Sequence, residues 1–227
     1  MNFPDGLFGD IWLQGAWLLW TVVLLWSLRC APWRRLGDNG QLNVLLGAIV
    51  ALTLLWSMKA GVRPGLNLHF LGACALTLMF GRSLAMLALT AVLAAVTFNA
   101  SLSGQEAWRA FALNAIVQAV FPVLVAHYVQ RFVERVFSAN IFIYIFGAAF
   151  FGAALTVLAT GALSGLLLWW SGAYSAELLL SDYLPFFLLL AFAEAWLNGA
   201  AITLMVVYLP AWVGSFDDRR YLWGKDK

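Results

Sequence analysis

The sequence predicts an all-α integral membrane protein, a single transmembrane domain over residues 1–227 built as a bundle of about seven helices. Two observations support this prediction. The chain is 63% hydrophobic and only 11% charged, whereas soluble domains average about 45–50% apolar and about 25% charged residues. The apolar residues also gather in runs near the roughly 20 residues that one helix needs to cross a bilayer. We therefore expect a multi-pass protein of the cell inner membrane, surrounded by membrane lipid.

Seven apolar segments give the predicted helices in chain order. The third and fourth are separated only by Gly81–Arg82–Ser83, so they are expected to form an antiparallel hairpin. The sixth is about thirty residues long, more than one perpendicular crossing requires, and must tilt, kink or project from the membrane. The segments are Ile11–Leu28, Leu42–Met58, Leu66–Gly81, Ser83–Leu102, Ala110–Gln130, Asn140–Ser171 and Tyr183–Trp212.

The lysines and arginines predict the orientation, because cytoplasmic loops carry an excess of both. An N-terminus outside and a C-terminus in the cytoplasm leave only Lys59, Arg63 and Arg109 on the outer side. Residues 1–10 then form an N-terminal plug segment, and residues 213–227 form a cytoplasmic tail. The inner side holds the other basic residues, which are Arg29, Arg34, Arg35, Arg82, Arg131, Arg135, Arg219, Arg220, Lys225 and Lys227.

The acidic residues complete this distribution of charge. With a net charge of only +2 and the two signs sorted in space, the chain has no basic patch for nucleic acid, which we exclude as a partner. In the predicted topology an acidic rim lies on the outer side, formed by Asp5, Asp10, Glu106, Glu177 and Asp182.

One imidazole and one amide head the predicted third helix, within the stretch Gly65–Gly72. Ionisable side chains at such depth are rare and mark ligand, ion or proton pathways. His69 is either a structural residue that bonds a neighbouring helix or a metal ligand, since neutral imidazole is the commonest metal ligand. A ligating imidazole needs an orienting partner on its other nitrogen, for which Asn67, Asn114 and Gln118 are candidates.

Two pairs of polar residues lie four positions apart within predicted helices, so each pair shares one helix face. Asn114 and Gln118 are explained either by interhelical hydrogen bonds or by a role in a site. Glu194, four residues before Asn198, is the only acid inside a predicted span. Its carboxyl group either stays protonated and hydrogen-bonded or belongs to a proton or cation path.

Several catalytic signatures are absent from the sequence. It contains no GxxxxGK[ST], HExxH or GxSxG motif, so neither ATP hydrolysis by a P-loop nor these hydrolase mechanisms can be assigned. The two histidines, His69 and His127, fall on opposite sides of the predicted membrane, and an all-histidine metal site is excluded. The sequence therefore predicts a transport subunit that is not an enzyme.

Short motifs along the chain resemble one known family. Met1–Gly6, which reads MNFPDG, resembles the opening Met-His-Ile-Pro-Asp-Gly of the CbiM/NikM family, the membrane-embedded substrate-capture subunits of energy-coupling-factor cobalt and nickel ABC importers. Leu68–Gly72 is similar to that family's His-Leu-hydrophobic-Gly stretch, and Ala112–Ala115 resembles its Gly-Ala-Asn-Val. Ala193–Ala195 is similar to its Gly-Glu-Ala. The resemblance spans most of the chain.

The resemblance implies a divalent transition metal, cobalt or nickel, as the substrate. In the family the metal is held by the α-amine of residue 1, the amide nitrogen and imidazole of residue 2, and the membrane histidine. Carried over, the metal ligands are Met1, Asn2 and His69. The supporting residues are Asn67, Asn114 and Asp5. The implied partners are a transmembrane coupling subunit and cytosolic ATPase subunits.

Asn2 departs from the family pattern, because it replaces a histidine and removes one imidazole donor. Asp5 could supply an oxygen donor instead. Two other functions remain compatible with the residues. One is a proton-coupled secondary transporter that works through Glu194, and the other is an accessory membrane protein that has lost metal binding. The metal hypothesis depends on the first two residues folding back, at Pro4 and Gly6, to meet the imidazole of His69.

Overall fold

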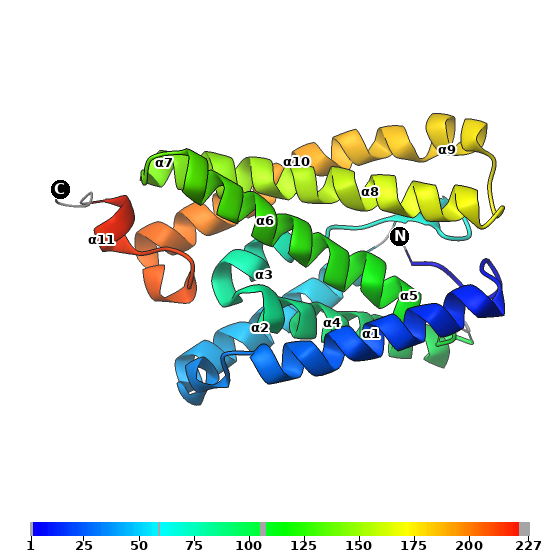
Figure 1. The fold of residues 1–227 in the computed structure, drawn as a ribbon, viewed down its shortest axis with the longest axis horizontal. Helices are drawn as coiled ribbons and strands as arrows, with labels where there is room; N and C mark the ends of the chain where they lie inside the picture. The colour runs from blue at the N-terminus through cyan, green and yellow to red at the C-terminus, as the bar shows by residue number, and fades with distance from the viewer. Residues whose placement is uncertain (1, 59, 105–107, 223–227) are drawn as a thin grey trace.

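The computed structural model describes residues 2–58, 60–104 and 108–222. Among residues that carried predictions, Met1, Lys59, Glu106, Lys225 and Lys227 lie outside this description. Long helices run roughly side by side (Figure 1). They are α1 (Asp10–Cys30), α2 (Asn39–Ser57), α4 (Arg82–Leu102), the continuous run of α5 (Phe111–Ala115), η2 (Ile116–Val120) and α6 (Phe121–Val136), the run of α7 (Ile141–Ile143), η3 (Tyr144–Phe151) and α8 (Gly152–Trp170), and α9 (Ala176–Asp182) with α10 (Leu184–Tyr208).

Short elements connect the long helices. Within the described residues they are η1 (Trp33–Gly37), a hairpin of β1 (Ala60–Arg63) and β2 (Leu66–Leu68), α3 (Ala73–Phe80), η4 (Pro210–Trp212) and α11 (Asp218–Tyr221). We call the end of the bundle with β1, β2 and residues 108–110 the hairpin end. The opposite end, with η1 and residues 209–222, is the tail end (Figure 1).

The predicted all-α membrane fold is confirmed, but with six candidate spans in the described residues instead of about seven. The prediction of a third helix over Leu66–Gly81 is wrong in its first half. Leu66–Leu68 pairs with β1 in antiparallel register, with Gly61 opposite Asn67, and only Ala73–Phe80 is helical. Eight residues of helix rise about 12 Å, less than half of the hydrocarbon thickness.

Burial against protein explains why this segment is nevertheless apolar. Seven of the eight residues of α3 are buried, and Ala75 alone is partly exposed. The helix packs against α4, α6 and α8, so its side chains contact neighbouring helices where a spanning helix would contact lipid. Hydropathy measures how apolar a segment is, and it does not distinguish lipid from protein as the surrounding medium.

Gly72 is where the chain turns from the extended segment after β2 into α3. Its φ is +65°, and a Cβ built there would lie 2.4 Å from Cδ2 of Leu52. We expect Gly72→Ala to lower the free energy of unfolding by about 2–5 kcal/mol, because left-handed alanine costs about 1–2 kcal/mol and overpacking about 1–3 kcal/mol. Denaturant unfolding in detergent measures this loss. Gly172→Ala is the matched control, since Gly172 has φ +74° and open space around its Cβ position. Equal losses in the two variants would contradict the steric argument.

The longest predicted helix is present as the run Ile141–Trp170, and its regular winding is interrupted. Residues Tyr144–Phe151 form a π-helical turn before α8 continues. Small residues recur every four positions in α8, at Gly152, Thr156, Thr160 and Ser164. Such spacing allows two helix backbones to approach closely, and α8 packs against α10. At Gly161 a Cβ would lie 2.3 Å from the ring of Phe187, so the two helices touch through this glycine.

The tail end is closed by the segment that follows α10. The N–H of Gly214 donates to the carbonyl of Met79 (2.9 Å), and Ser215 N–H donates to Leu78 O (3.1 Å). Nη1 of Arg35 also donates to Met79 O (2.7 Å), and partial burial lowers the pKa of this guanidinium below its usual value. These donors satisfy the last carbonyls of α3, which have no partner within the helix itself.

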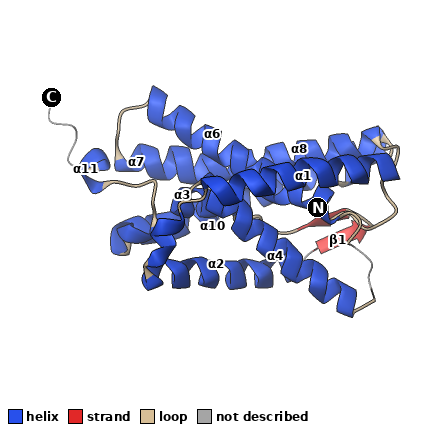
Figure 2. Cartoon of the chain, turned by 60° about the horizontal axis from the view of Figure 1, so that its bottom comes forward, coloured by secondary structure: helices blue, strands red, loops and turns tan. Residues whose placement is uncertain are grey.

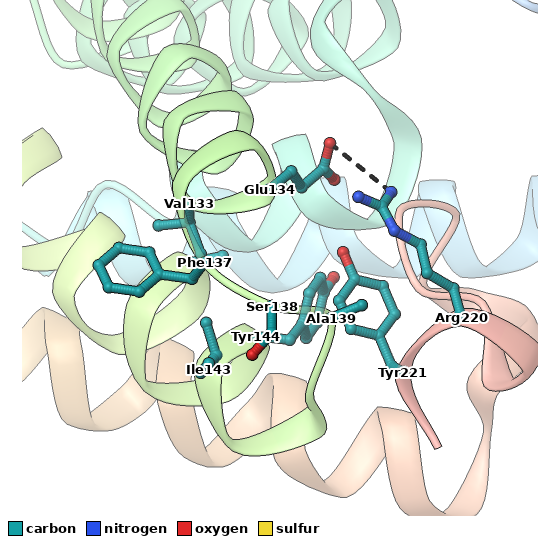
Figure 3. A pocket seen from close by; sticks show the side chains of 10 residues that line it. Val133, Glu134, Phe137, Ser138, Ala139, Ile143, Tyr144, Arg220 and Tyr221 are labelled. Atoms are coloured by element: carbon teal, nitrogen blue, oxygen red, sulfur yellow. Dashed lines mark ion pairs between the residues drawn. The ribbon is translucent and has the colours of Figure 1, made fainter. Parts of the chain in front are cut away.

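A narrow pocket lies beside this segment, between α6, η3 and α11 (Figure 3). Glu134 and Arg220 face each other across it at 3.9 Å. Its lining is otherwise mainly aromatic and aliphatic, including Phe137, Tyr144 and Tyr221. The pocket is at the tail end, away from the residues that the sequence analysis singled out as metal ligands.

Candidate metal centre

The N-terminal segment enters the bundle at the hairpin end and lies beside β2 (Figure 2). Phe3 is buried and its ring packs on Phe8, with the centroids 5.0 Å apart. Its N–H donates to Oδ1 of Asn114 (2.8 Å), and its carbonyl accepts from Nδ2 of Asn114 (2.9 Å). The amide of Asn114 thus pairs with the backbone of Phe3 as a neighbouring strand would.

A second asparagine holds the preceding residue in the same way. The backbone N–H of Asn2 donates to Oδ1 of Asn67 (2.7 Å), and Nδ2 of Asn67 donates to Asn2 O (3.4 Å). Asn67 lies on β2, opposite Gly61 of β1. Residues 2 and 3 are therefore held between the hairpin and α5. Met1, the predicted source of an α-amine ligand, lies outside the described residues.

His69 lies in the extended segment between β2 and α3, where a helix was predicted. Its side chain is 97% buried, and its ring packs on Trp56 with the centroids 4.6 Å apart. Nδ1 is 3.0 Å from the carbonyl oxygen of Phe70, and Nε2 is 3.0 Å from Oε1 of Gln118. Both ring nitrogens face oxygen acceptors, and a neutral ring donates to only one of them. With its proton on Nε2 the ring donates to Oε1 of Gln118. With its proton on Nδ1 it donates to Phe70 O instead, gives up the hydrogen bond to Gln118 and presents the Nε2 lone pair to a metal. This is the tautomer that a metal ligand needs, with a backbone carbonyl orienting the ring.

Gln118 connects the imidazole to Asn2. Its Nε2 donates to Oδ1 of Asn2 (2.8 Å) and to Oδ1 of Asn114 (3.3 Å). The amide orientation follows from Asn114, whose Oδ1 already accepts from the backbone of Phe3 and must accept from Gln118 too. Oε1 of Gln118 therefore faces His69. The sequence predicted that Gln118 shares a helix face with Asn114. In the structure Gln118 lies in the π-helical turn η2. Turns of this kind are common at functional sites.

Asp5 does not point at the imidazole. Its Oδ1 accepts from the N–H of Ala110 (2.8 Å) and its Oδ2 from the N–H of Arg109 (3.3 Å). A carboxylate at this position satisfies free N–H groups where α5 begins, and the helix dipole favours a negative charge there. Asp5 thus fixes the start of the helix that carries Asn114. Asp10, which was predicted to share the acidic rim with Asp5, pairs with Arg109 at 2.6 Å on the surface.

The donor set combines one imidazole with amide groups. Among the described residues there is no group of three or more histidine, cysteine, aspartate or glutamate side chains. Nε2 of His69 contacts Oε1 of Gln118, and Nε2 of Gln118 contacts Oδ1 of Asn2. The backbone nitrogen of Asn2 is bonded to Asn67. These are nitrogen and neutral oxygen donors, which suit a borderline transition metal better than calcium or magnesium.

Solved structures share this fold. A structure described as a truncated transition metal transporter aligns with a TM-score of 0.70 and 17% identity, over 92% of this chain and 99% of that chain. A second, described as a transition metal transporter, aligns with a TM-score of 0.68 and 17% identity, over 91% of this chain and 93% of that chain. The curated proteins compared with the chain give no match.

A family model gives the assignment. The model named CbiM, described as the cobalt uptake substrate-specific transmembrane region, matches residues 2–212. The chain is accordingly a multi-pass membrane protein and a transport component with no enzymatic role of its own. With nearly the whole sequence inside the match, this chain belongs to the CbiM family of cobalt uptake substrate-specific transmembrane regions.

Proposed function

We propose that this chain captures a divalent transition metal, cobalt or nickel, at its hairpin end through Met1, Asn2 and His69. The observation that carries the proposal is the chain of hydrogen bonds from His69 through Gln118 to Asn2. It holds the second residue of the protein next to a buried imidazole 67 positions later in the sequence. Asn67 and Asn114 fix the backbone of residues 2 and 3 on either side.

The α-amine of Met1 is the further nitrogen donor in this proposal. It is one residue from Asn2, whose backbone is already fixed by Asn67. A free α-amine has a pKa near about 7.7–8.0, so it gives up its proton to a metal at neutral pH. His69 Nε2 is the second nitrogen donor. The third is the backbone nitrogen of Asn2, which must release the proton that it now donates to Asn67. Oδ1 of Asn2 or Oε1 of Gln118 can provide an oxygen as the fourth.

The orientation in the membrane forms part of the proposal. Arg35, Arg82, Arg131 and Arg220 lie on elements that end or connect at the tail end. The positive-inside rule places that end in the cytoplasm, and the metal centre then faces outward. Within an energy-coupling-factor complex the partners would be a transmembrane coupling subunit and cytosolic ATPases, because this sequence has no P-loop.

An N-terminal extension tests the proposal directly. Full-length protein with a native N-terminus, purified in detergent, should bind cobalt(II) in a calorimetric titration. The same protein extended by Gly-Ser before Met1 should bind at least about 10-fold more weakly, because the α-amine is lost as a donor and the new residues need space in the buried segment. A matched control carries the extension after Lys227 and should behave as native. Equal affinities would contradict a site at the N-terminus, and no binding by the native protein would favour the accessory role.

A further inference from the structure

Two side chains of α10 hold the beginning of the short helix α3. Oε2 of Glu194 accepts from the N–H of Leu71 (2.9 Å), and Oε1 accepts from the N–H of Gly72. One turn along α10, Oδ1 of Asn198 accepts from the N–H of Ala75 (2.9 Å). The pair that shares one face of α10 is thus directed at one turn of backbone in α3.

Local sequence explains why α3 needs this help. The first N–H groups of any helix have no partner inside it, and the residues before α3 are Phe70, Leu71 and Gly72, which have no side-chain acceptor. In water such groups would be hydrated. Here Leu71 is fully buried, and an unpaired buried N–H costs about 1–3 kcal/mol. A carboxylate from a distant helix supplies the missing acceptors.

Glu194 itself is 98% buried, so its own placement also needs an explanation. Three N–H donors converge on its two oxygens, from Leu71, Gly72 and Nδ2 of Asn198 at 3.0 Å. The start of a helix carries partial positive charge, which favours a carboxylate there. The contacts are those of an acceptor fixed in one position, which a proton carrier that must change partners would not require.

These bonds set the direction of the imidazole. Leu71 and Gly72 are two and three residues after His69, and the carbonyl of the intervening Phe70 contacts Nδ1 of the ring. Trp56 donates its Nε1–H to Leu71 O (3.3 Å), and its ring packs against the imidazole at an interplanar angle of 43°. The position of the ring therefore depends on where the turn at residues 70–72 is held.

We propose that Glu194, supported by Asn198, is a positioning residue for metal capture: it fixes the Leu71–Gly72 turn so that Nε2 of His69 faces the N-terminal segment. This inference rests on the proposed function, and it gives the buried acid a role other than proton coupling.

The test uses cobalt(II) alone, titrated into full-length protein with a native N-terminus. The d–d absorption bands report ligand geometry as well as occupancy. Glu194→Gln keeps the shape of the side chain but replaces one acceptor by an N–H donor. We expect it to weaken cobalt binding by roughly 10- to 100-fold, the usual effect of losing a residue that orients a ligand, and to shift the d–d bands at saturation.

Glu134→Gln is the matched control, because Glu134 is a partly buried acid at the tail end that bonds Gln130 (2.9 Å). It should leave affinity and bands as in the native protein. Loss of thermal stability in Glu194→Gln with native affinity and native bands would overturn the inference and leave a purely structural role. Loss of proton-driven uptake with native cobalt binding would also overturn it, in favour of a proton path.

Two further variants keep the inference testable. If Glu194→Gln does not fold, Glu194→Asp retains the charge but shortens its reach, and Asn198→Ala removes one donor to the carboxylate. Each should shift the bands and weaken binding in the same direction, and native values in both would overturn the inference.

His69→Ala separates the two proposals. If it binds cobalt normally the proposed function fails, whereas if it does not bind and the Glu194 variants are native, only the positioning role fails.

Discussion

Replacement of His69 by alanine is expected to weaken cobalt and nickel binding by more than about 100-fold, beyond the 10- to 100-fold typical of residues that only orient a ligand. The reason is that His69 is the only imidazole in the site region of this sequence. The remaining donors are amide groups and the α-amine, and neutral amide oxygens are weak ligands for these metals. Titration against a chromophoric chelator measures affinities across this range.

The chain offers a matched control in its other histidine. His127 lies on α6, where its ring contacts Tyr128, and His127→Ala should bind cobalt as the native protein does. Melting temperatures of both variants check that the fold is retained, since Trp56 would lose its ring contact with the imidazole in His69→Ala. Native affinity in a folded His69→Ala protein would remove the metal from this site altogether.

The sequence predicts the long helices well and the third segment poorly, and both results have a physical cause. Spans such as α2 and α4 are long enough to cross a bilayer and apolar along their length, so composition and length identify them. The segment Leu66–Gly81 is equally apolar, but it is buried by protein, which allows extended backbone because β1 supplies its hydrogen bonds. Gly65 and Gly72, both with positive φ, are the local signals that a helix does not cover the whole segment.

The candidate site could be predicted in its composition more than in its connections. The motif around His69 and the shared face of Asn114 and Gln118 are visible in the sequence. The pairing of Asn67 with the Asn2 backbone depends on a hairpin whose second strand, Leu66–Leu68, lies in a segment predicted as helix. Asp5 was expected near the metal, but its contacts are with the start of α5. The partners of Glu194 are backbone N–H groups more than 120 positions away, and no sequence pattern identifies such partners.

Restoring a histidine at position 2 is the second change with a large expected effect. Asn2→His should raise nickel(II) affinity by about 100-fold or more, because an imidazole replaces a weak amide oxygen and gives a set of four nitrogens, which suits the square-planar preference of nickel(II) and copper(II). Cobalt(II), which has less preference for that geometry, should gain less. Competition titrations with both metals measure the two gains, and the nickel d–d bands report whether a square plane has formed.

A histidine placed elsewhere in the chain tests whether the gain depends on position 2 or only on adding an imidazole. Asn39→His adds an imidazole at the exposed start of α2, at the tail end, and should leave nickel affinity unchanged. Combining Asn2→His with His69→Ala should cancel most of the gain, because the new imidazole strengthens binding by joining donors that the fold already brings together, and energies of residues that share one partner do not add. A full gain without His69 would mean that the N-terminal residues bind nickel by themselves. Metal capture would then require only the first two residues of the chain, and the buried network of Gln118, Asn114 and Asn67 would serve only to fix the segment in the bundle.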